Sequence, residues 1–355
     1  MGVRFNKNNW HNRSVVMRFF AGLGTTMSLL MSSPIIEATQ SRIRKIEQIA
    51  LNVVRLELEP ADPNALFATC EAGAHIDVAL PNGLVRQYSL VNPGDSQRYV
   101  IAVGLDANSR GGSACIHHDL NEGDELALSL PRNHFPLQDC SRPVVLVAGG
   151  IGITPIWSMV QTLEQRQQSW VLYYCARTPE HAAFLDDITT LAEHSSVGQV
   201  VPVFDQVQDG KPLDLAHMFA KHGAQARFYC CGPTGLLDAF VTTAQQQGIP
   251  DNQVHIERFS ATENTGENQP FDVVLNDGSV HHIPADKSIL EVLIEAGEPV
   301  MYSCMEGTCG TCETHVISGD VEHRDAILTP EEKKGNHSMM ICVSRCAAGK
   351  LTLDI

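Results

Sequence analysis

The chain has 355 residues and a mass of 38.8 kDa, which exceeds what one hydrophobic core supports, so two or three domains are expected. Hydrophobic residues make up 43% and charged residues 19%, a composition that excludes a disordered polymer. The formal charge is −16, so the chain lacks the excess of basic residues typical of nucleic-acid-binding proteins, and no nucleic-acid partner is expected. Residues 260–355 hold six basic and sixteen acidic residues. This bias indicates a separate C-terminal module that docks a basic surface.

The first forty residues are set apart from the fold. Phe19–Met31 is apolar but shorter than the ~20 residues of a membrane-spanning helix, and Gly22 and Gly24 interrupt it. A targeting segment is one interpretation, and a disordered leader or a misassigned start, with Met27 or Met31 as the true first residue, is the other. We take residues 1–40 as such a leader and expect no membrane partner.

Residues 41–140 predict an antiparallel β-barrel. Short runs with period-two alternation are separated by turn signals rich in Gly, Pro and Asn. No helical pattern longer than a turn or two interrupts them. The expected strands are Leu51–Leu58, His75–Leu80, Leu84–Val91, Tyr99–Leu105 and Glu125–Leu130.

Residues 141–259 predict an α/β domain with a parallel sheet and helices on both faces. Its first run is continuously apolar, as in a strand buried on both sides, and strands and helices then alternate regularly. The expected strands are Val144–Ala148, Trp170–Cys175, Gln199–Phe204, Arg227–Cys230 and Val254–Phe259. The expected helices are Thr154–Arg166, His181–His194, Leu213–Lys221 and Gly235–Gln247.

A polar linker over residues 260–270 leads to a third unit, residues 271–355. This unit begins with two short strands, continues with a helix and ends in loops and short strands. The expected elements are Phe271–Leu275, Val280–Ile283, Ser288–Ala296, Glu313–Ser318 and Leu351–Ile355.

Four cysteines in this unit have the spacing of a plant-type [2Fe–2S] site. Four residues separate Cys304 from Cys309, two separate Cys309 from Cys312, and Cys342 follows at a distance. The intervening glycines allow the loop to wrap a cluster and turn N–H groups toward it. A zinc site would favour two C-x-x-C pairs, and a redox-active C-x-x-C would leave Cys304 unexplained.

Seven further cysteines are scattered, and an odd total of eleven does not suit a disulfide scaffold, so a reducing cytoplasm is expected. Cys346 competes with Cys342 as the fourth iron ligand. The usual spacing favours Cys342 and leaves Cys346 as a small buried hydrophobe. The seven are Cys70, Cys115, Cys140, Cys175, Cys230, Cys231 and Cys346.

Two motifs in the barrel segment suit a flavin. In the first, Arg86-Gln87-Tyr88-Ser89-Leu90, Arg86 can pair with a phosphate or the ring edge, Tyr88 can stack on the ring, and Ser89 can hydrogen-bond near the hydride-accepting N5. In the second, Gly111-Gly112-Ser113 can offer N–H groups and a hydroxyl to a phosphate. Each motif alone is better explained by an ordinary strand or turn, but their occurrence in this order on one barrel favours a flavin site.

A glycine-rich junction in the α/β segment suits a nicotinamide cofactor. Its glycines, Gly149, Gly150 and Gly152, let a pyrophosphate approach, with Thr154 as N-cap and Pro155 in the first turn of the next helix. The G-x-G-x-x-G fingerprint of dehydrogenases is absent.

Later strands of the same segment end in further candidates. Cys231-Gly232-Pro233 ends a predicted strand where ligands gather at the carboxyl edge of a parallel sheet. Arg177 and Asp205 follow two other strands and are either ligands of the ribose or phosphates or ordinary surface residues. An acid near the 2′-hydroxyl favours NADH over NADPH.

Over about residues 40–355 the chain resembles the reductase components of Rieske-type oxygenase systems, the group of phthalate dioxygenase reductase and the vanillate and carnitine monooxygenase reductases. The resemblance implies a ferredoxin-reductase-like barrel that binds FMN, an NAD domain and a C-terminal β-grasp ferredoxin domain. It also implies that Phe259 lies near the flavin where the nicotinamide enters. The leader and Cys346 depart from the family pattern. The matching motifs are Arg86–Leu90, Gly111–Ser113 with His117 downstream, Ala148–Pro155, Cys231–Pro233, Glu257–Phe259 and the four cysteines.

The order of the three units implies a route for electrons. NADH gives two electrons as hydride, a [2Fe–2S] cluster takes one, and a flavin handles both, so FMN stands between them. Ser89, Cys231 and Phe259 would surround the hydride transfer, with Cys231 positioning rather than attacking. We expect a monomeric reductase that docks transiently on a terminal Rieske-type oxygenase. The alternatives are a non-enzymatic iron–sulfur carrier or redox sensor, and a reductase of another acceptor such as a quinone.

Overall fold

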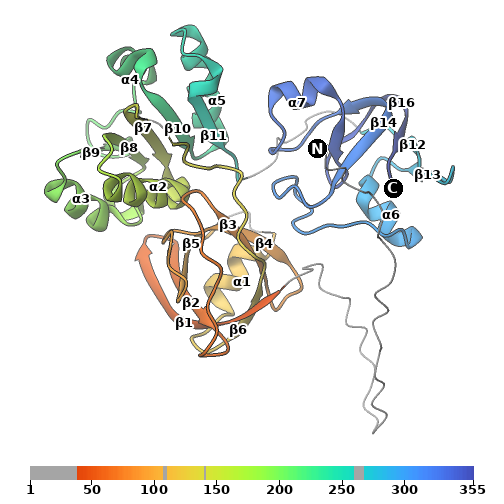
Figure 1. Ribbon diagram of the computed structural model, residues 1–355, viewed down its shortest axis with the longest axis horizontal. Coiled ribbons are helices and arrows are strands. Elements are labelled where there is room, and N and C mark those ends of the chain that lie inside the picture. The colour runs from red at the N-terminus through yellow and green to blue at the C-terminus, as the bar shows by residue number, and fades with distance from the viewer. Residues whose placement is uncertain (1–37, 107–109, 140, 260–267) are drawn as a thin grey trace, which may run out of the picture. The chain divides into compact units, whose positions relative to one another are not determined.

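The computed structural model describes residues 38–106, 110–139, 141–259 and 268–355. Three sheets are formed within these ranges (Figure 1). No helix in the described part of the chain combines the length and apolarity needed to cross a membrane. The apolar stretch Phe19–Met31, on which the targeting interpretation rests, lies outside the described residues.

The first sheet is antiparallel and curls into the expected barrel, with strand order β4-β3-β6-β1-β2-β5 (Figure 1). All five predicted strands are present, but the longest strand, β1, was not predicted. Only two of its twelve residues, Ser41 and Ile43, are buried, so its hydrophobic alternation is weak. The strands are β1 (Thr39–Ala50), β2 (Val53–Pro60), β3 (His75–Ala79), β4 (Val85–Ser89), β5 (Tyr99–Gly104) and β6 (Glu125–Leu128).

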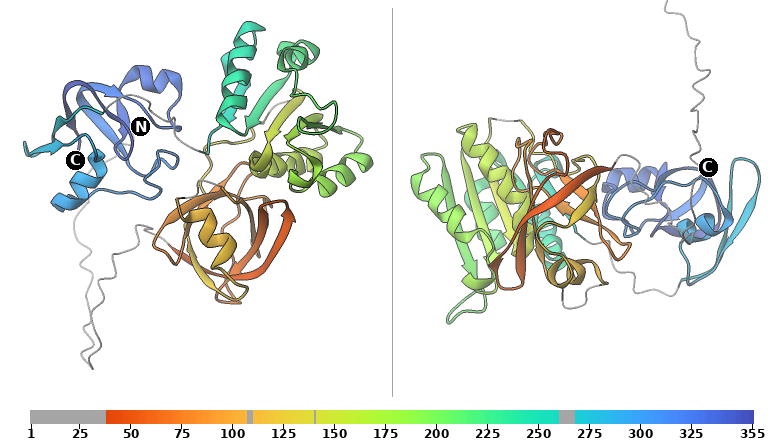
Figure 2. Two further views of the ribbon diagram at one scale, coloured as in Figure 1. Left: turned by 180° about the vertical axis from the view of Figure 1, so that it is seen from behind. Right: turned by 90° about the horizontal axis from the view of Figure 1, so that it is seen from below.

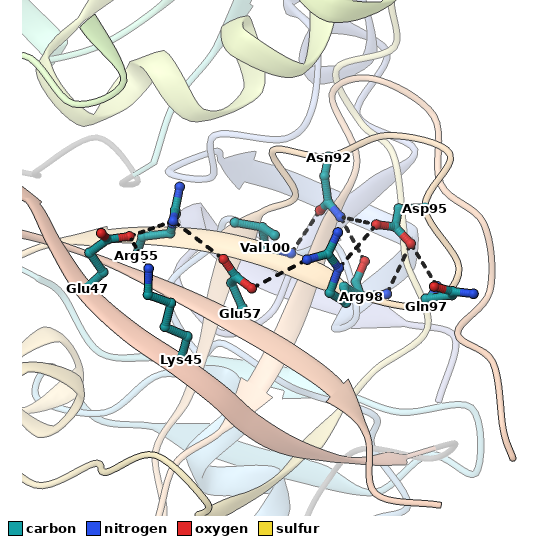
Figure 3. Close-up of polar contacts among 9 residues, drawn as sticks. All are labelled: Lys45, Glu47, Arg55, Glu57, Asn92, Asp95, Gln97, Arg98 and Val100. Carbon is teal, nitrogen blue, oxygen red and sulfur yellow. Dashed lines mark hydrogen bonds and ion pairs between the residues drawn. The ribbon is translucent and has the colours of Figure 1, made fainter. Parts of the chain in front are cut away.

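Hydrogen bonds just beyond β4 join the two outermost strands of this sheet. The N–H of Val91 donates to the carbonyl of Val100 at 2.9 Å, and the N–H of Val100 donates to Asn92 Oδ1 at 2.8 Å. Asn92 Nδ2 also donates to the carbonyl of Arg98 at 2.8 Å (Figure 3). These bonds satisfy strand edges that would otherwise be open to pairing with another chain.

The second sheet is parallel, as expected, with order β11-β10-β7-β8-β9. Val145 and Val147 of β7 pack with helices α4 and α5, whereas Leu146 and Ala148 pack with α2 and α3. Helices therefore cover both faces (Figures 1 and 2). The strands are β7 (Val144–Gly149), β8 (Trp170–Ala176), β9 (Gly198–Phe204), β10 (Arg227–Cys231) and β11 (Val254–Glu257). The helices are α2 (Ile153–Gln165), α3 (Leu185–His194), α4 (Leu215–His222) and α5 (Thr234–Gln246).

One predicted helix of this domain was too long. The segment expected to be helical from His181 begins instead with a 3₁₀ turn, η2 (Pro179–His181), and α3 starts only at Leu185. Phe184 between them has a left-handed φ of 60°, which is incompatible with a continuous α-helix.

The third sheet is mixed, with order β13-β12-β16-β14-β15 and a parallel β12–β16 pair. The predicted strands and helix are present, but β14 and β16 are longer than expected, and the short elements α7 and β15 were not predicted. A capping box, Ser288 with Glu291, starts helix α6. The elements are β12 (Phe271–Val274), β13 (Val280–Ile283), α6 (Ile289–Ala296), β14 (Glu313–Glu322), α7 (Pro330–Gly335), β15 (Ser338–Met340) and β16 (Arg345–Leu353).

Candidate cofactor cavity and iron–sulfur centre

A cavity of about 270 Å³ is lined by residues from all three predicted domains. The barrel contributes its β4 motif, the α/β domain contributes Thr154 and the end of β11, and the loop containing Cys304 comes from the third unit. Residues expected to act at a flavin and at an iron–sulfur cluster thus share one cavity. Among the lining residues are Arg86, Gln87, Tyr88, Ser89, Ser113, Thr154, Glu257, Phe259, Cys304 and Glu306.

Strand β4 gives the cavity both polar and aromatic surface. The Tyr88 side chain packs against the barrel core, and burial raises the pKa of its phenol. Gln87 Nε2 donates to Asp77 Oδ1 at 3.0 Å, so this side chain is held by the neighbouring strand. The Ser89 residue is buried at the cavity wall. This wall can face a planar ring and hydrogen-bond to its edge.

The predicted glycine loop forms the start of helix α1 (Gly112–His118), with Gly111 at a φ of 95°. Ser113 lines the cavity, and its Oγ accepts a hydrogen bond from the N–H of Asp106. A Cβ on Gly112 would lie 2.8 Å from Cγ and Nε of Arg86. Gly112 therefore makes room for the arginine side chain, a steric role that the sequence motif did not reveal.

The chain reverses its strand order between β7 and β10, so their carboxyl ends form the switch point where ligands bind in such sheets. A Cβ on Gly152 would lie 2.3 Å from the carbonyl oxygen of Cys231, and one on Gly149 would lie 2.8 Å from Pro233. These glycines permit close backbone approach of the two motifs. Gly150, at a φ of 55°, has open space around its Cβ position and is the glycine placed to admit a ligand.

One expectation at this junction is wrong. Thr154 is not the N-cap of α2, because the helix starts at Ile153 and Gly152 takes the cap position. The Thr154 hydroxyl donates instead to the carbonyl of Ile151 at 3.1 Å. Pro155 does lie in the first turn of the helix, as expected.

Four other candidates do not line the cavity. The Cys231 side chain is fully buried, and burial raises the pKa of its thiol well above its ordinary value. The thiol is therefore neutral, which suits packing rather than nucleophilic attack. Arg177 and Asp205 follow the adjacent strands β8 and β9 and lie at the same edge of the sheet. Gly232 packs against the backbone of Gly149.

The four cysteines of the iron–sulfur motif are buried and form two pairs of thiols. Hydrogen bonding between Cys304 and Cys309 lowers the pKa of the first and raises that of the second. The same relation holds between Cys312, whose pKa is lowered, and Cys342, whose pKa is raised. Four such thiols would supply the protein ligands of a two-iron cluster.

The backbone around these thiols fits a cluster. The N–H groups of Glu306 and Thr311 donate to the sulfurs of Cys304 and Cys309 at 3.3 and 3.4 Å. Gly307 has a φ of 69°, and a Cβ there would lie 2.6 Å from Val343. The donor set and the loop shape therefore suit [2Fe–2S].

Cys346 is half-buried, not fully buried as expected, and takes part in neither thiol pair. It belongs to β16, and its Sγ donates to the carbonyl of Ala348 at 3.2 Å. The geometry favours Cys342 as the fourth ligand.

Two buried polar atoms at the cavity wall support the fit of a polar ring ligand. His75 Nε2 and Glu257 Oε2 have no hydrogen-bond partner among the described residues. Both residues line the cavity. A ligand with complementary donors and acceptors would satisfy these atoms, which are costly when left unpaired.

Family models and relatives agree with these sites. The model for the 2Fe–2S iron–sulfur cluster binding domain matches residues 274–347, and that for the oxidoreductase NAD-binding domain matches residues 146–242. Phthalate dioxygenase reductase of Burkholderia cepacia is 44% identical over 322 residues, covering 88% of this chain and 96% of the relative. The chain belongs to the family of reductase components of oxygenase systems.

Further comparisons cover nearly the whole chain. Tetrachlorobenzoquinone reductase of Sphingobium chlorophenolicum is 40% identical over 92% of this chain and 100% of the relative. The solved structure of phthalate dioxygenase reductase, described as modular for electron transfer from pyridine nucleotides to [2Fe–2S], has a TM-score of 0.70 and 41% identity. The match covers 91% of this chain and 100% of the chain in that structure. This chain is accordingly an NAD(P)H-dependent oxidoreductase with a [2Fe–2S] domain.

Sequence reasoning missed four polar residues of this region, Asp77, Glu257, Ser303 and Glu306. Glu257 stood in a quoted motif without a role, and Glu306 is the charged residue within the cysteine loop. Its charge within the cysteine loop could have identified Glu306 as a candidate functional residue from the sequence. No local sequence pattern identified Asp77 or Ser303, because the hydrogen bond between them joins residues that are 226 positions apart.

Glu257 yields a prediction about stability. Solvent reaches part of the residue through the cavity but not its Oε2, and burial raises the pKa of the carboxyl to about 8. The unfolded chain releases this proton near pH 4.5, so folded-state stability falls as pH rises from there toward 8, by at most about 1.4 kcal/mol per pH unit. We expect Glu257→Gln to raise the melting temperature at pH 8 more than at pH 5, measured by calorimetry on the holoprotein. Parallel pH profiles for the two proteins would contradict this.

Proposed function

We propose that this chain is an NADH-dependent reductase that passes electrons through FMN to its [2Fe–2S] cluster and on to a Rieske-type oxygenase. In this proposal residues 41–140 hold FMN, 141–259 hold NADH and 271–355 hold the cluster. Most of the linker expected over 260–270 lies outside the described residues. The supporting observation is the shared cavity, in which Cys304 stands in one wall with Arg86–Ser89 and Glu257–Phe259. When bound, FMN converts between two-electron hydride chemistry and one-electron transfer.

The chain's own residues would place the reactants. Tyr88 would supply an apolar face for the ring, and the Ser89 hydroxyl a hydrogen bond at its edge. Phe259, at the cavity rim and 43% exposed, would cover the ring until the nicotinamide enters. The open space at Gly150 would admit the pyrophosphate. Holding donor and acceptor in near contact is the main contribution a protein can make to hydride transfer.

The acceptor is proposed from the charge of the third unit. Its excess of acidic residues would complement a basic patch on an oxygenase in a transient complex. Because salt screens such charges, turnover with the partner would fall with added salt. Every described cysteine is a free thiol, which suits the reducing cytoplasm. A quinone is the second candidate acceptor, since one relative carries the name tetrachlorobenzoquinone reductase.

Anaerobic titration of the purified protein with NADH tests this function. We expect the visible bands of flavin and cluster to bleach and the electron paramagnetic resonance signal of a reduced [2Fe–2S] centre to appear. Acid extraction should release FMN, and an FAD peak would overturn that assignment. Protein that contains the cluster but oxidises no NADH would be a carrier or redox sensor instead. Competing a Rieske-type oxygenase against a benzoquinone for the electrons would identify the acceptor.

A further inference from the structure

The loop that carries the first iron ligand is tied to the barrel on both sides of Cys304. Ser303 Oγ donates to Asp77 Oδ2 at 2.6 Å. Glu306 Oε1 forms ion pairs with Arg86 Nη2 at 3.2 Å and Arg110 Nη2 at 2.8 Å. Both sets of contacts join the proposed cluster domain to the proposed flavin domain, within three residues of one ligand.

The first contact lies in a buried, fully engaged network. Asp77 and Ser303 are 1% and 7% exposed. The carboxylate of Asp77 also accepts hydrogen bonds from Arg132 and Gln87, the latter a neighbour in the β4 motif. A buried carboxylate with three donors is rigid, so it fixes the start of the cysteine loop firmly.

The second contact depends on the shape of the loop. Met305 has a left-handed φ of 56° and a side chain that is exposed to solvent, whereas the Glu306 side chain is only 17% exposed. The turn at Met305 and Gly307 thus points the carboxylate of Glu306 toward the barrel. A methionine in this conformation is strained, and such strain persists where surrounding contacts hold it.

The ion pair with Arg86 differs from an ordinary surface salt bridge. Both side chains are 17% exposed, and Gly112 leaves the space in which the arginine lies. Arg110 is 71% exposed, so its pair is screened more strongly. Two guanidinium groups facing one carboxylate retain a net positive charge, which leaves them able to attract a phosphate as well.

We propose that Glu306 and Ser303 are positioning residues that hold the cysteine loop against the flavin cavity and thereby set the rate of electron transfer from flavin to cluster. This inference rests on the proposed function. In each transfer the flavin loses one electron and the cluster gains one, and NADH supplies both electrons of the pair. Neither residue takes part in the redox chemistry itself.

Stopped-flow reduction of the holoprotein by NADH tests this proposal, because flavin and cluster bleaching can be followed separately. For Glu306→Gln we expect the ratio of the cluster reduction rate to the flavin reduction rate to fall about tenfold, equivalent to about 1.4 kcal/mol. Added salt should slow cluster reduction in the wild type and have little effect in the variant. The matched control is Glu331→Gln, which removes the same charge from an exposed site in the same domain.

Three more variants distinguish a loss of positioning from a defect in cluster assembly. Arg110→Gln removes one of the two ion pairs of Glu306 from the barrel side without altering the cysteine loop, and Glu306→Gln/Arg110→Gln should be no slower than Glu306→Gln alone. Ser303→Ala should also slow cluster reduction. Wild-type cluster reduction in both Glu306→Gln and Arg110→Gln would overturn the positioning role. Failure of NADH to reduce the cluster in the wild type would instead overturn the proposed function.

Discussion

Cys342→Ser is expected to abolish the [2Fe–2S] centre while leaving flavin reduction by NADH intact. The Cys342 thiol hydrogen-bonds with that of Cys312, and its loss would leave a cluster with three of its four proposed protein ligands. The visible absorption of the cluster and the paramagnetic signal of its reduced form should both disappear. Iron and sulfide analysis of the purified variant provides an independent measurement.

The matched control is Cys346→Ser, four positions further along the chain. Because Cys346 Sγ donates to the carbonyl of Ala348 and belongs to neither thiol pair, this variant should retain the full cluster spectrum. A serine hydroxyl can replace that hydrogen bond. If Cys346→Ser lost the cluster and Cys342→Ser kept it, the assignment of the fourth ligand would be wrong.

Gly152→Ala is expected to slow NADH-dependent flavin reduction about a hundredfold. The added Cβ would lie 2.3 Å from the carbonyl oxygen of Cys231 and 2.7 Å from the nitrogen of Gly232. Backbone atoms cannot move aside as a flexible side chain can, so the ends of β7 and β10 must separate. Displacement of a cofactor site by about 1 Å can cost about a hundredfold in rate. Stopped-flow measurement of flavin bleaching at saturating and subsaturating NADH separates binding from hydride transfer.

Gly235→Ala supplies the control for this prediction. It places the same methyl group in the first turn of α5, where nothing lies within 4 Å of the Cβ position. Alanine favours a helix over glycine, so this variant should fold and react normally. Equal flavin reduction rates in the two variants would show that the close approach of the Gly152 and Cys231 backbones is not required for a working cofactor site.

Much of the fold was predictable because local patterns encode it. The continuous apolar run Val144–Ala148 identified a strand buried on both faces, and the strands and helices that follow it were found within a few residues. Strand β1 was missed because so few of its side chains are buried, and β15 because three residues carry little periodicity. The helix start at Leu185 depended on the φ of Phe184, which a hydrophobic pattern does not report.

The sequence by itself determined the spacing of the four cysteines, the order of the three sheets along the chain and the glycine-rich junctions, because these depend on patterns within short stretches of chain. Only the tertiary structure decided what individual side chains do there. It placed Gly152 against Cys231, left Glu257 Oε2 buried without a partner, and joined Glu306 to two arginines of the barrel. Burial, charge pairing and close backbone approach arise between segments that packing brings together, so no local pattern can specify them.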